Sequence, residues 1–198
     1  MNKYEHAFGK NDIRGIYGED ITEELFYNTG RSFVEWLHQQ SDKKVSDMWI
    51  TITRDARLHS PALEKALSDG ITSTGANVIN LGLAPTPIGY YSEVVGISGY
   101  NVIAAAIITA SHNPKEYNGL KMTFNKRTLT EQQIKEVRDI TFKNWVDSPK
   151  NPSEPLKKTG IIENYNIIPT YIKDMEERFG KIGEGVKIVV DSANATGG

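Results

Sequence analysis

The segment from 101 to 109, NVIAAAIIT, is almost wholly apolar and is followed at once by polar turn residues. A run this short and this apolar is typical of a central β-strand covered on both faces, because a strand with one solvated face alternates apolar and polar residues. Sheets buried on both faces occur where helices pack on both sides. The run therefore predicts a layered α/β domain.

Helical and extended patterns alternate on both sides of this strand. Phe26, Phe33 and Leu37 share one face of a helix expected at 23–40, and Ser60 and Thr130 are expected to cap two later helices. The expected helices are 23–40, 60–74, 86–95 and 130–145, and the expected strands are 48–53, 77–82, 101–109 and 119–124. This order supports a single α/β core domain.

The pattern changes near residue 146, where VDSPKNPSEPLKKTG holds three prolines and no apolar period. Beyond it we expect a helix within 165–180 and a strand at 186–191, which cannot bury a core of their own. We therefore expect a first domain at 1–150, a linker at 151–165 and the beginning of a second α/β domain at 166–198. On this interpretation the chain is a fragment of a longer protein.

Composition excludes several classes of protein. The net charge is −2, so no overall basic field attracts nucleic acid or an anionic membrane. The chain has no cysteine, which excludes disulfides, thiolate zinc sites and a cysteine nucleophile. It also has no apolar stretch long enough for a signal peptide or a membrane span, so we expect a cytoplasmic protein.

Ser111, His112 and Asn113 lie where the apolar strand should end, and in open α/β sheets ligands bind at the carboxyl ends of strands. Such residues are also common in turns, and alone they would indicate no more than a turn. Two cations change this interpretation: Lys121 on the adjoining strand and Arg14 near the N-terminus. A hydroxyl between a lysine and an arginine suits a phosphate.

Each cation has a structural alternative. Arg14 could pair only with Asp12 or Asp20, and Lys121 could be a solvated strand residue. Without the serine loop, both alternatives would be preferred.

The segment TASHNPKEYNGLKM, 109–122, closely resembles the phosphoserine loop of the α-D-phosphohexomutases, the phosphoglucomutase and phosphomannomutase superfamily. The likeness continues in NDIRGIYG, TRDARLHSPAL, GLAPTPIGYY and the terminal IVVDSANATGG. The resemblance implies a three-layer α/β/α first domain with a mixed sheet, followed by the beginning of a second domain.

The resemblance also implies roles for the residues. Ser111 would carry a phosphoryl group and exchange it with a hexose phosphate substrate through a bisphosphorylated sugar. Lys121 would serve in acid/base catalysis or phosphate contact, and Arg14 would stabilise the moving phosphoryl group. His112 is a second candidate for proton transfer. Asn113 is a candidate for substrate or phosphate binding.

Arg57, in TRDAR, is a further candidate for phosphate binding. Alternatively, Arg57 forms a structural pair with Asp55 that holds the loop. His6, His38 and His59 lie at no metal-ligand spacing and are expected to be surface or core residues.

The family's cofactor is Mg²⁺, held by the serine phosphate and by aspartates of the second domain. This chain would contribute only Ser111, through its phosphate, and hexose 1,6-bisphosphate would act as activator. The fragment alone is therefore expected to be inactive as a mutase. EYNGLK favours glucose or mannose phosphate over glucosamine phosphate, and the oligomeric state stays open.

Two other functions remain as alternatives. A non-catalytic module could bind sugar phosphates with the same loop. A serine hydrolase is disfavoured because Thr109 and Asn113 stand where the G-x-S-x-G elbow has glycines, and because adjacent Ser111 and His112 side chains are not expected to hydrogen-bond.

Overall fold

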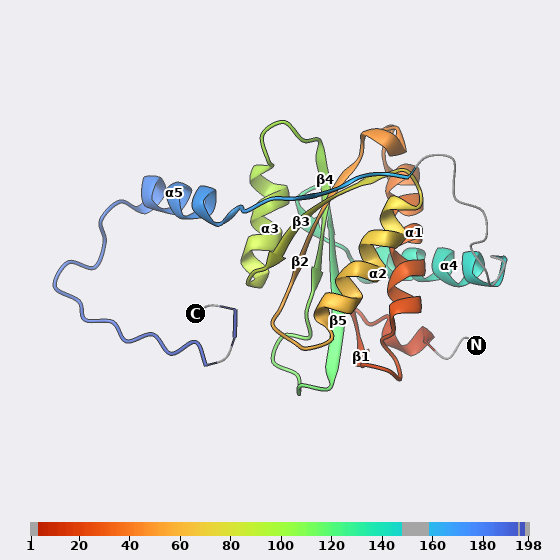
Figure 1. Cartoon of the computed structure of the whole chain (residues 1–198), viewed down its shortest axis with the longest axis horizontal. Coiled ribbons are helices and arrows are strands. Elements are labelled where there is room, and N and C mark those ends of the chain that lie inside the picture. The colour runs from red at the N-terminus through yellow and green to blue at the C-terminus, as the bar shows by residue number, and fades with distance from the viewer. Residues whose placement is uncertain (1–3, 148–158, 194, 197–198) are drawn as a thin grey trace.

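A sheet lies between two layers of helices, and a further helix and an extended segment project from one side (Figure 1). The computed structural model describes residues 4–147, 159–193 and 195–196. The expected three-layer α/β/α fold is confirmed. None of the helices in these ranges is both long and apolar enough to cross a membrane.

The sheet is mixed, with the strand order β1-β5-β4-β2-β3-β7. Its strands are β1 Ile13–Ile16, β2 Trp49–Arg54, β3 Asn77–Leu83, β4 Val102–Ile108, β5 Tyr117–Phe124 and β7 Ile162–Asn164, and the short β6 Arg127–Thr128 pairs with β5. β4, β2, β3 and β7 are parallel, whereas β5 is antiparallel to both β4 and β1. The apolar run thus forms an interior strand, as predicted, and β2 and β4 end side by side.

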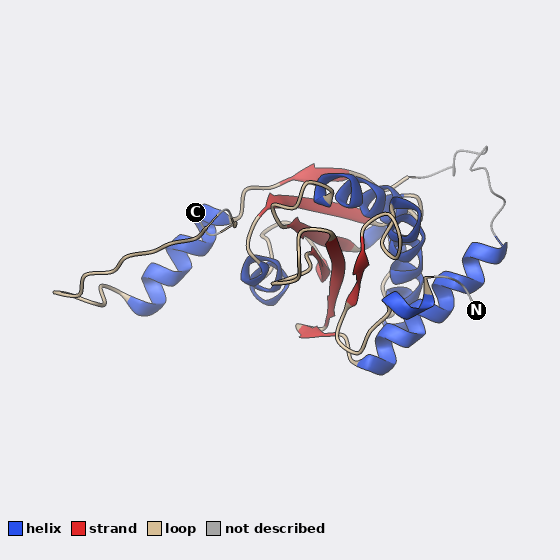
Figure 2. Ribbon diagram, turned by 90° about the horizontal axis from the view of Figure 1, so that it is seen from below, coloured by secondary structure: helices blue, strands red, loops and turns tan. Residues whose placement is uncertain are grey.

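Among the described residues, three helices cover one face of the sheet and one helix covers the other (Figure 2). The first group is α1 Glu23–Gln40, α2 Ser60–Thr72 and α4 Glu131–Asp147, and the opposite helix is α3 Thr86–Val95. Thr130 caps α4 as expected: its amide donates to Gln133 Oε1 at 2.8 Å and its hydroxyl accepts from the Gln133 amide at 3.4 Å.

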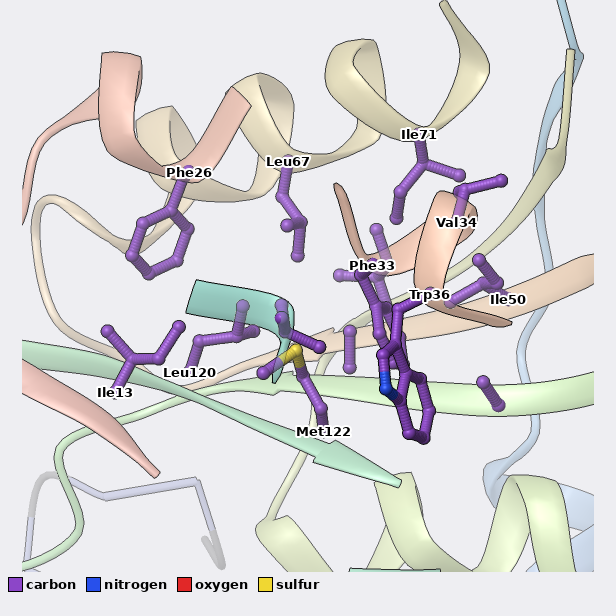
Figure 3. Packing of buried hydrophobic residues seen from close by; sticks show 14 of the residues in the cluster. Ile13, Phe26, Phe33, Val34, Trp36, Ile50, Leu67, Ile71, Leu120 and Met122 are labelled. Atoms are coloured by element: carbon purple, nitrogen blue, oxygen red, sulfur yellow. The ribbon is translucent and has the colours of Figure 1, made fainter. Parts of the chain in front are cut away.

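The main core lies between α1, α2 and one face of the sheet (Figure 3). Phe26 and Phe33 of α1 are fully buried against Leu120 and Met122 of β5, which confirms the predicted helical face. α1 and α2 approach closely because Gly70 has no side chain: a Cβ there would lie 2.1 Å from the Tyr27 carbonyl oxygen.

The described residues from 159 onward depart from the sequence prediction at two places and agree with it at a third. In the expected linker, 151–158 lies outside the described residues, but Ile162–Asn164 forms β7 and pairs in parallel with β3. Three residues are too few to show an alternating pattern, so sequence periodicity did not reveal this strand. α5, Ile168–Phe179, matches the expected helix, and Tyr171 packs edge-on against Tyr91 with ring centroids 5.0 Å apart.

The strand expected at 186–191 is wrong, because these residues have no regular structure. Val189 is 96% exposed and Val190 is 77% exposed. Their β-branched side chains favour a strand, but a strand also needs a neighbour for its backbone hydrogen bonds. Within the described ranges none lies beside them.

Glu93 on α3 is a buried carboxyl group through which we expect the stability of the domain to depend on pH. Its side chain is 5% exposed, and its Oε1 accepts a hydrogen bond from the Lys126 amide at 2.7 Å. Burial raises the pKa of Glu93, against the smaller lowering effect of the hydrogen bonds from Thr123 and Lys126. The folded state therefore holds this proton more tightly than the unfolded state, and its stabilising contribution is lost as the pH rises through the raised pKa.

We expect Glu93→Gln to remove this loss. The measurement is urea unfolding at a series of pH values. As the pH rises above the ordinary pKa of glutamate, the unfolding free energy should fall less in Glu93→Gln than in the parent chain. Glu19→Gln, at an exposed position, is the control and should follow the parent. A pH dependence unchanged by Glu93→Gln would show that the buried carboxyl is not its source.

Candidate active site

The serine loop connects β4 to β5 at the carboxyl end of the interior strand. Ser111 has φ +55° and an exposed side chain, and its amide donates to Thr109 Oγ1 at 2.9 Å. The Asn113 amide donates to the Ala110 carbonyl at 3.0 Å and closes the turn. Left-handed backbone is unfavourable for a non-glycine residue and is often found at functional sites. The turn places the hydroxyl of Ser111 in solvent, at the edge where ligands of such sheets bind.

Asp12 brings the two predicted cations together. Lys121 Nζ donates to Asp12 Oδ2 at 2.7 Å, and Arg14 Nη2 donates to the same oxygen. Arg14 Nη1 also donates to the carbonyl of Ala110, the residue before Ser111, at 3.3 Å. The pairing of Arg14 with Asp12 is confirmed. The alternative that Lys121 is merely solvated is wrong, since its side chain is 18% exposed.

This arrangement leaves a positive charge beside the serine loop. One carboxylate offsets one of two cations, and the third side-chain nitrogen of Arg14, Nε, is buried with no hydrogen-bond partner in the described structure. Buried donors without partners are uncommon. The excess positive charge suits the cluster to an incoming anion with several acceptor oxygens.

Arg57 follows β2 and crosses beneath the serine loop. Its Nε donates to Asp55 Oδ2 at 3.1 Å, and its Nη1 and Nη2 each donate to two backbone carbonyls. The four acceptors are the carbonyl oxygens of Ser111, Asn113, Pro114 and Tyr117. All five N–H groups of the guanidinium are thus in use.

Arg57 therefore positions the loop and offers no donor to a phosphate in this structure. Its side chain is 13% exposed. The structural pair with Asp55 is confirmed, and the phosphate-binding role expected for Arg57 stays a prediction that these contacts do not support. Asn113 contributes its carbonyl to this arrangement, and its side chain is half-buried beside Ser111.

His112 contradicts one expectation. Its Nδ1 lies 3.1 Å from Ser111 Oγ, although side chains adjacent in sequence were not expected to hydrogen-bond. The left-handed backbone at Ser111 accounts for this contact, because extended backbone would direct successive side chains to opposite sides. Both side chains are exposed, so His112 can exchange protons with solvent and with the hydroxyl.

A second set of loop contacts was not predicted. His59 Nε2 lies 3.1 Å from the Lys115 carbonyl, and Asn118 Nδ2 lies 2.7 Å from His59 Nδ1. Ser60 does not cap α2: it is the first residue of the helix, and its hydroxyl donates to Asp55 Oδ1 at 2.7 Å. Competition from the partly buried carboxylate of Asp55 explains that error, and no sequence spacing indicates these contacts.

A cluster suited to a metal is not present in the described ranges: they hold no group of three or more His, Cys, Asp or Glu side chains in a suitable arrangement. The candidate ligand from this chain remains a phosphate on Ser111. Its exposed hydroxyl leaves room for such a group. A hard oxygen ligand of this kind fits Mg²⁺.

Comparison with known proteins bears on this site. Residues 5–146 match the family model described as phosphoglucomutase/phosphomannomutase, alpha/beta/alpha domain I. A phosphomannomutase/phosphoglucomutase of Pseudomonas aeruginosa is 32% identical over 96% of this chain, and a phosphoglucosamine mutase of Levilactobacillus brevis is also 32% identical over 96%. The matched regions are 37% and 41% of those relatives, so the chain spans less than half of their length.

The fold has a solved counterpart. The crystal structure of a phosphoglucomutase/phosphomannomutase family protein from Burkholderia thailandensis superposes with a TM-score of 0.73 and 28% identity, covering 87% of this chain and 36% of that one. The α/β/α fold, the loop at the end of its interior strand and the match over residues 5–146 agree. The chain belongs to the phosphoglucomutase/phosphomannomutase family, through its α/β/α domain I.

Proposed function

We propose that this chain carries the phosphoserine loop of a phosphohexomutase, which interconverts hexose 1-phosphate and hexose 6-phosphate. The observation that supports it most strongly is the exposed Ser111 hydroxyl on a loop that Arg14 binds at Ala110, with Arg14 and Lys121 held together by Asp12. Phosphoryl transfer needs positioning and neutralisation of charge more than covalent help. The loop would supply the positioning, and the cationic cluster would supply the neutralisation of charge.

In the proposed reaction Ser111 enters the cycle phosphorylated. A free hydroxyl oxygen of the hexose phosphate bonds to phosphorus while the P–Oγ bond breaks, and a bisphosphorylated sugar forms. The sugar hydroxyl gives up its proton to a base, for which Lys121 in its uncharged form is the candidate, so that Arg14 supplies the positive charge in this step. His112, 3.1 Å from Oγ, can return a proton to the serine. After the sugar reorients, Oγ attacks the other phosphate and the steps run in reverse.

Mg²⁺ completes the proposal. Bound to a phosphate oxygen of Ser111, it would neutralise charge on the phosphoryl group. The remaining ligands would come from outside this chain. Arg14 stays the chain's own means of stabilising that charge, through its positive charge and the N–H groups of Nη1 and Nη2 that its bonds to Ala110 and Asp12 do not use.

The proposal concerns a protein of the relatives' length. The chain alone is proposed to be inactive as a mutase, because it covers about two-fifths or less of the relatives it matches. The phosphomannomutase/phosphoglucomutase and the phosphoglucosamine mutase are equally similar to this chain. The proposed preference for glucose or mannose phosphate therefore rests on the segment EYNGLK and must be tested by assay.

The test is turnover by the full-length protein with Mg²⁺ and a trace of hexose 1,6-bisphosphate. We expect conversion of glucose 1-phosphate or mannose 1-phosphate to the 6-phosphate, with a lag when the bisphosphate is omitted. Binding of hexose phosphates without turnover would favour the non-catalytic module. Labelling of Ser111 by an acyl-enzyme probe would favour the hydrolase, for which the described structure shows no carboxylate on His112.

Lys121 supplies a prediction about proton transfer. Replacement by Met removes the charge and the proton, and we expect kcat of the full-length enzyme to fall by about 10² to 10⁴-fold. Lys121→Arg keeps the charge but cannot release a proton, so a base role predicts a similar loss and a pure phosphate contact predicts recovery. Steady-state assays across pH measure both.

Lys115→Met is the control for Lys121, because Lys115 lies in the same loop with its side chain exposed. It should retain near-parental kcat. Full activity in Lys121→Met would remove Lys121 from the mechanism.

A further inference from the structure

The orientation of the Asn118 amide is determined by its neighbours. Its Oδ1 accepts from the Gly119 amide at 2.8 Å, so its Nδ2 must be the group that faces the other two partners. Nδ2 lies 2.9 Å from Ser60 Oγ and 2.7 Å from His59 Nδ1. Ser60 has one proton and gives it to Asp55, and therefore accepts from Asn118.

This arrangement determines the tautomer of His59. Because Asn118 presents an N–H, Nδ1 of His59 must be an unprotonated acceptor. Nε2 then carries the proton and donates it to the Lys115 carbonyl, 3.1 Å away, in the serine loop. The neutral imidazole thus joins the base of β5 to the middle of the loop.

The other neighbours hold the ring in place. Tyr17 stacks on it with centroids 4.4 Å apart and planes 13° apart, and its hydroxyl donates to Glu23 at 2.5 Å. Asp55 is separated from the imidazole by Ser60, and Arg57 is occupied by the loop carbonyls. In the described structure, none of the contacts made by the ring is with a carboxylate.

We propose that His59 is a positioning residue for the serine loop and acts only as the neutral Nε2–H tautomer. Protonation would place an N–H of Nδ1 against the N–H of Asn118. Asn118 cannot turn to accept it without losing its bond to Gly119. An acidic solution would therefore loosen the loop that carries Ser111. The functional consequence rests on the proposed phosphoryl transfer, whereas the tautomer and the loop contact do not.

The first test uses the 198-residue chain and long-range ¹H–¹⁵N NMR of its histidines. At neutral pH we expect His59 to show an unprotonated Nδ1 and a protonated Nε2. On acidification the backbone amide signals of the loop should shift together with the His59 ring. A protonated Nδ1 at neutral pH, or loop signals that stay fixed while the ring titrates, would overturn the proposal.

Two substitutions separate the contacts of the ring. His59→Gln can place an amide N–H where Nε2–H lies, whereas His59→Asn mimics Nδ1 and does not reach Lys115. Exchange of the Asn113 and Tyr117 amides, both bonded within the loop, should stay within about 2-fold of the parent in His59→Gln and rise about 10-fold in His59→Asn. Equal exchange in both variants would contradict the loop contact.

Activity provides a separate readout. In the full-length enzyme, the fall in kcat/KM at acidic pH should be smaller in His59→Gln than in the parent, and His38→Gln, far from the loop, should leave it unchanged. An identical acidic fall in His59→Gln would contradict the positioning role. If the NMR result holds but Ser111 never becomes phosphorylated, only the proposed function fails.

Discussion

Ser111→Ala is expected to abolish hexose phosphate interconversion by the full-length enzyme, with a loss on the order of 10³-fold or more in kcat. The proposed cycle has no other hydroxyl that could carry the phosphoryl group between the two positions of the sugar. The substitution removes no atom that takes part in the contacts of Asp12 with its cations or of Arg57 with the loop carbonyls. Affinity for hexose phosphate should therefore persist while turnover disappears.

Ser111 has a left-handed backbone, so alanine could also disturb the turn. Ser111→Gly tests this, since glycine adopts φ +55° without strain and equally lacks the hydroxyl. Both variants should be inactive. Ser46→Ala, at an exposed serine before β2, is the matched control and should keep parental activity. Turnover that survives in Ser111→Gly would remove the serine from the mechanism.

Arg57→Lys is expected to lower kcat by about 10²-fold and the unfolding free energy by about 2 kcal/mol. Lysine keeps the positive charge but replaces five N–H groups in a planar fork with three on one atom. It cannot bond Asp55 and four loop carbonyls together. The loop should then lose its turn, and Ser111 its position relative to Arg14.

Hydrogen exchange of the loop amides and steady-state kinetics measure the two parts of this prediction. Arg127→Lys, at an exposed arginine of β6, is the control and should change neither. If Arg57 instead bound the substrate phosphate, Arg57→Lys would chiefly raise KM and leave loop exchange unchanged. That result would contradict the positioning role.

Helices and interior strands could be predicted from the sequence because each has its own local pattern. The face of α1 with Phe26 and Phe33 repeats at helical spacing, and the apolar run of β4 marks a strand buried on both sides. β1 and β7 could not be predicted in this way, since strands of four and three residues are too short to show a hydrophobic pattern. Residues 186–191 show the opposite case, a strand-like pattern without a strand to pair with.

Some residues of the candidate active site could likewise be predicted from the sequence, and some of their contacts could not. Ser111, Lys121 and Arg14 were predicted because residue type and motif point to phosphate chemistry. Arg57 was foreseen as holding the loop only through its pair with Asp55. Its bonds to loop carbonyls and the contact of His59 were not predicted, since a backbone carbonyl is present at every residue whatever the sequence. Asp12 was foreseen as a partner of Arg14 alone, because its contact with Lys121 depends on β1 lying beside β5.

The most direct test of the account is peptide mass spectrometry of the full-length protein after incubation with a hexose 1,6-bisphosphate and Mg²⁺. We predict one phosphate on the peptide that contains Ser111, removed on addition of excess hexose monophosphate and absent from Ser111→Ala. Rapid turnover of hexose phosphates with no phosphate on that peptide at any time would contradict the central claim.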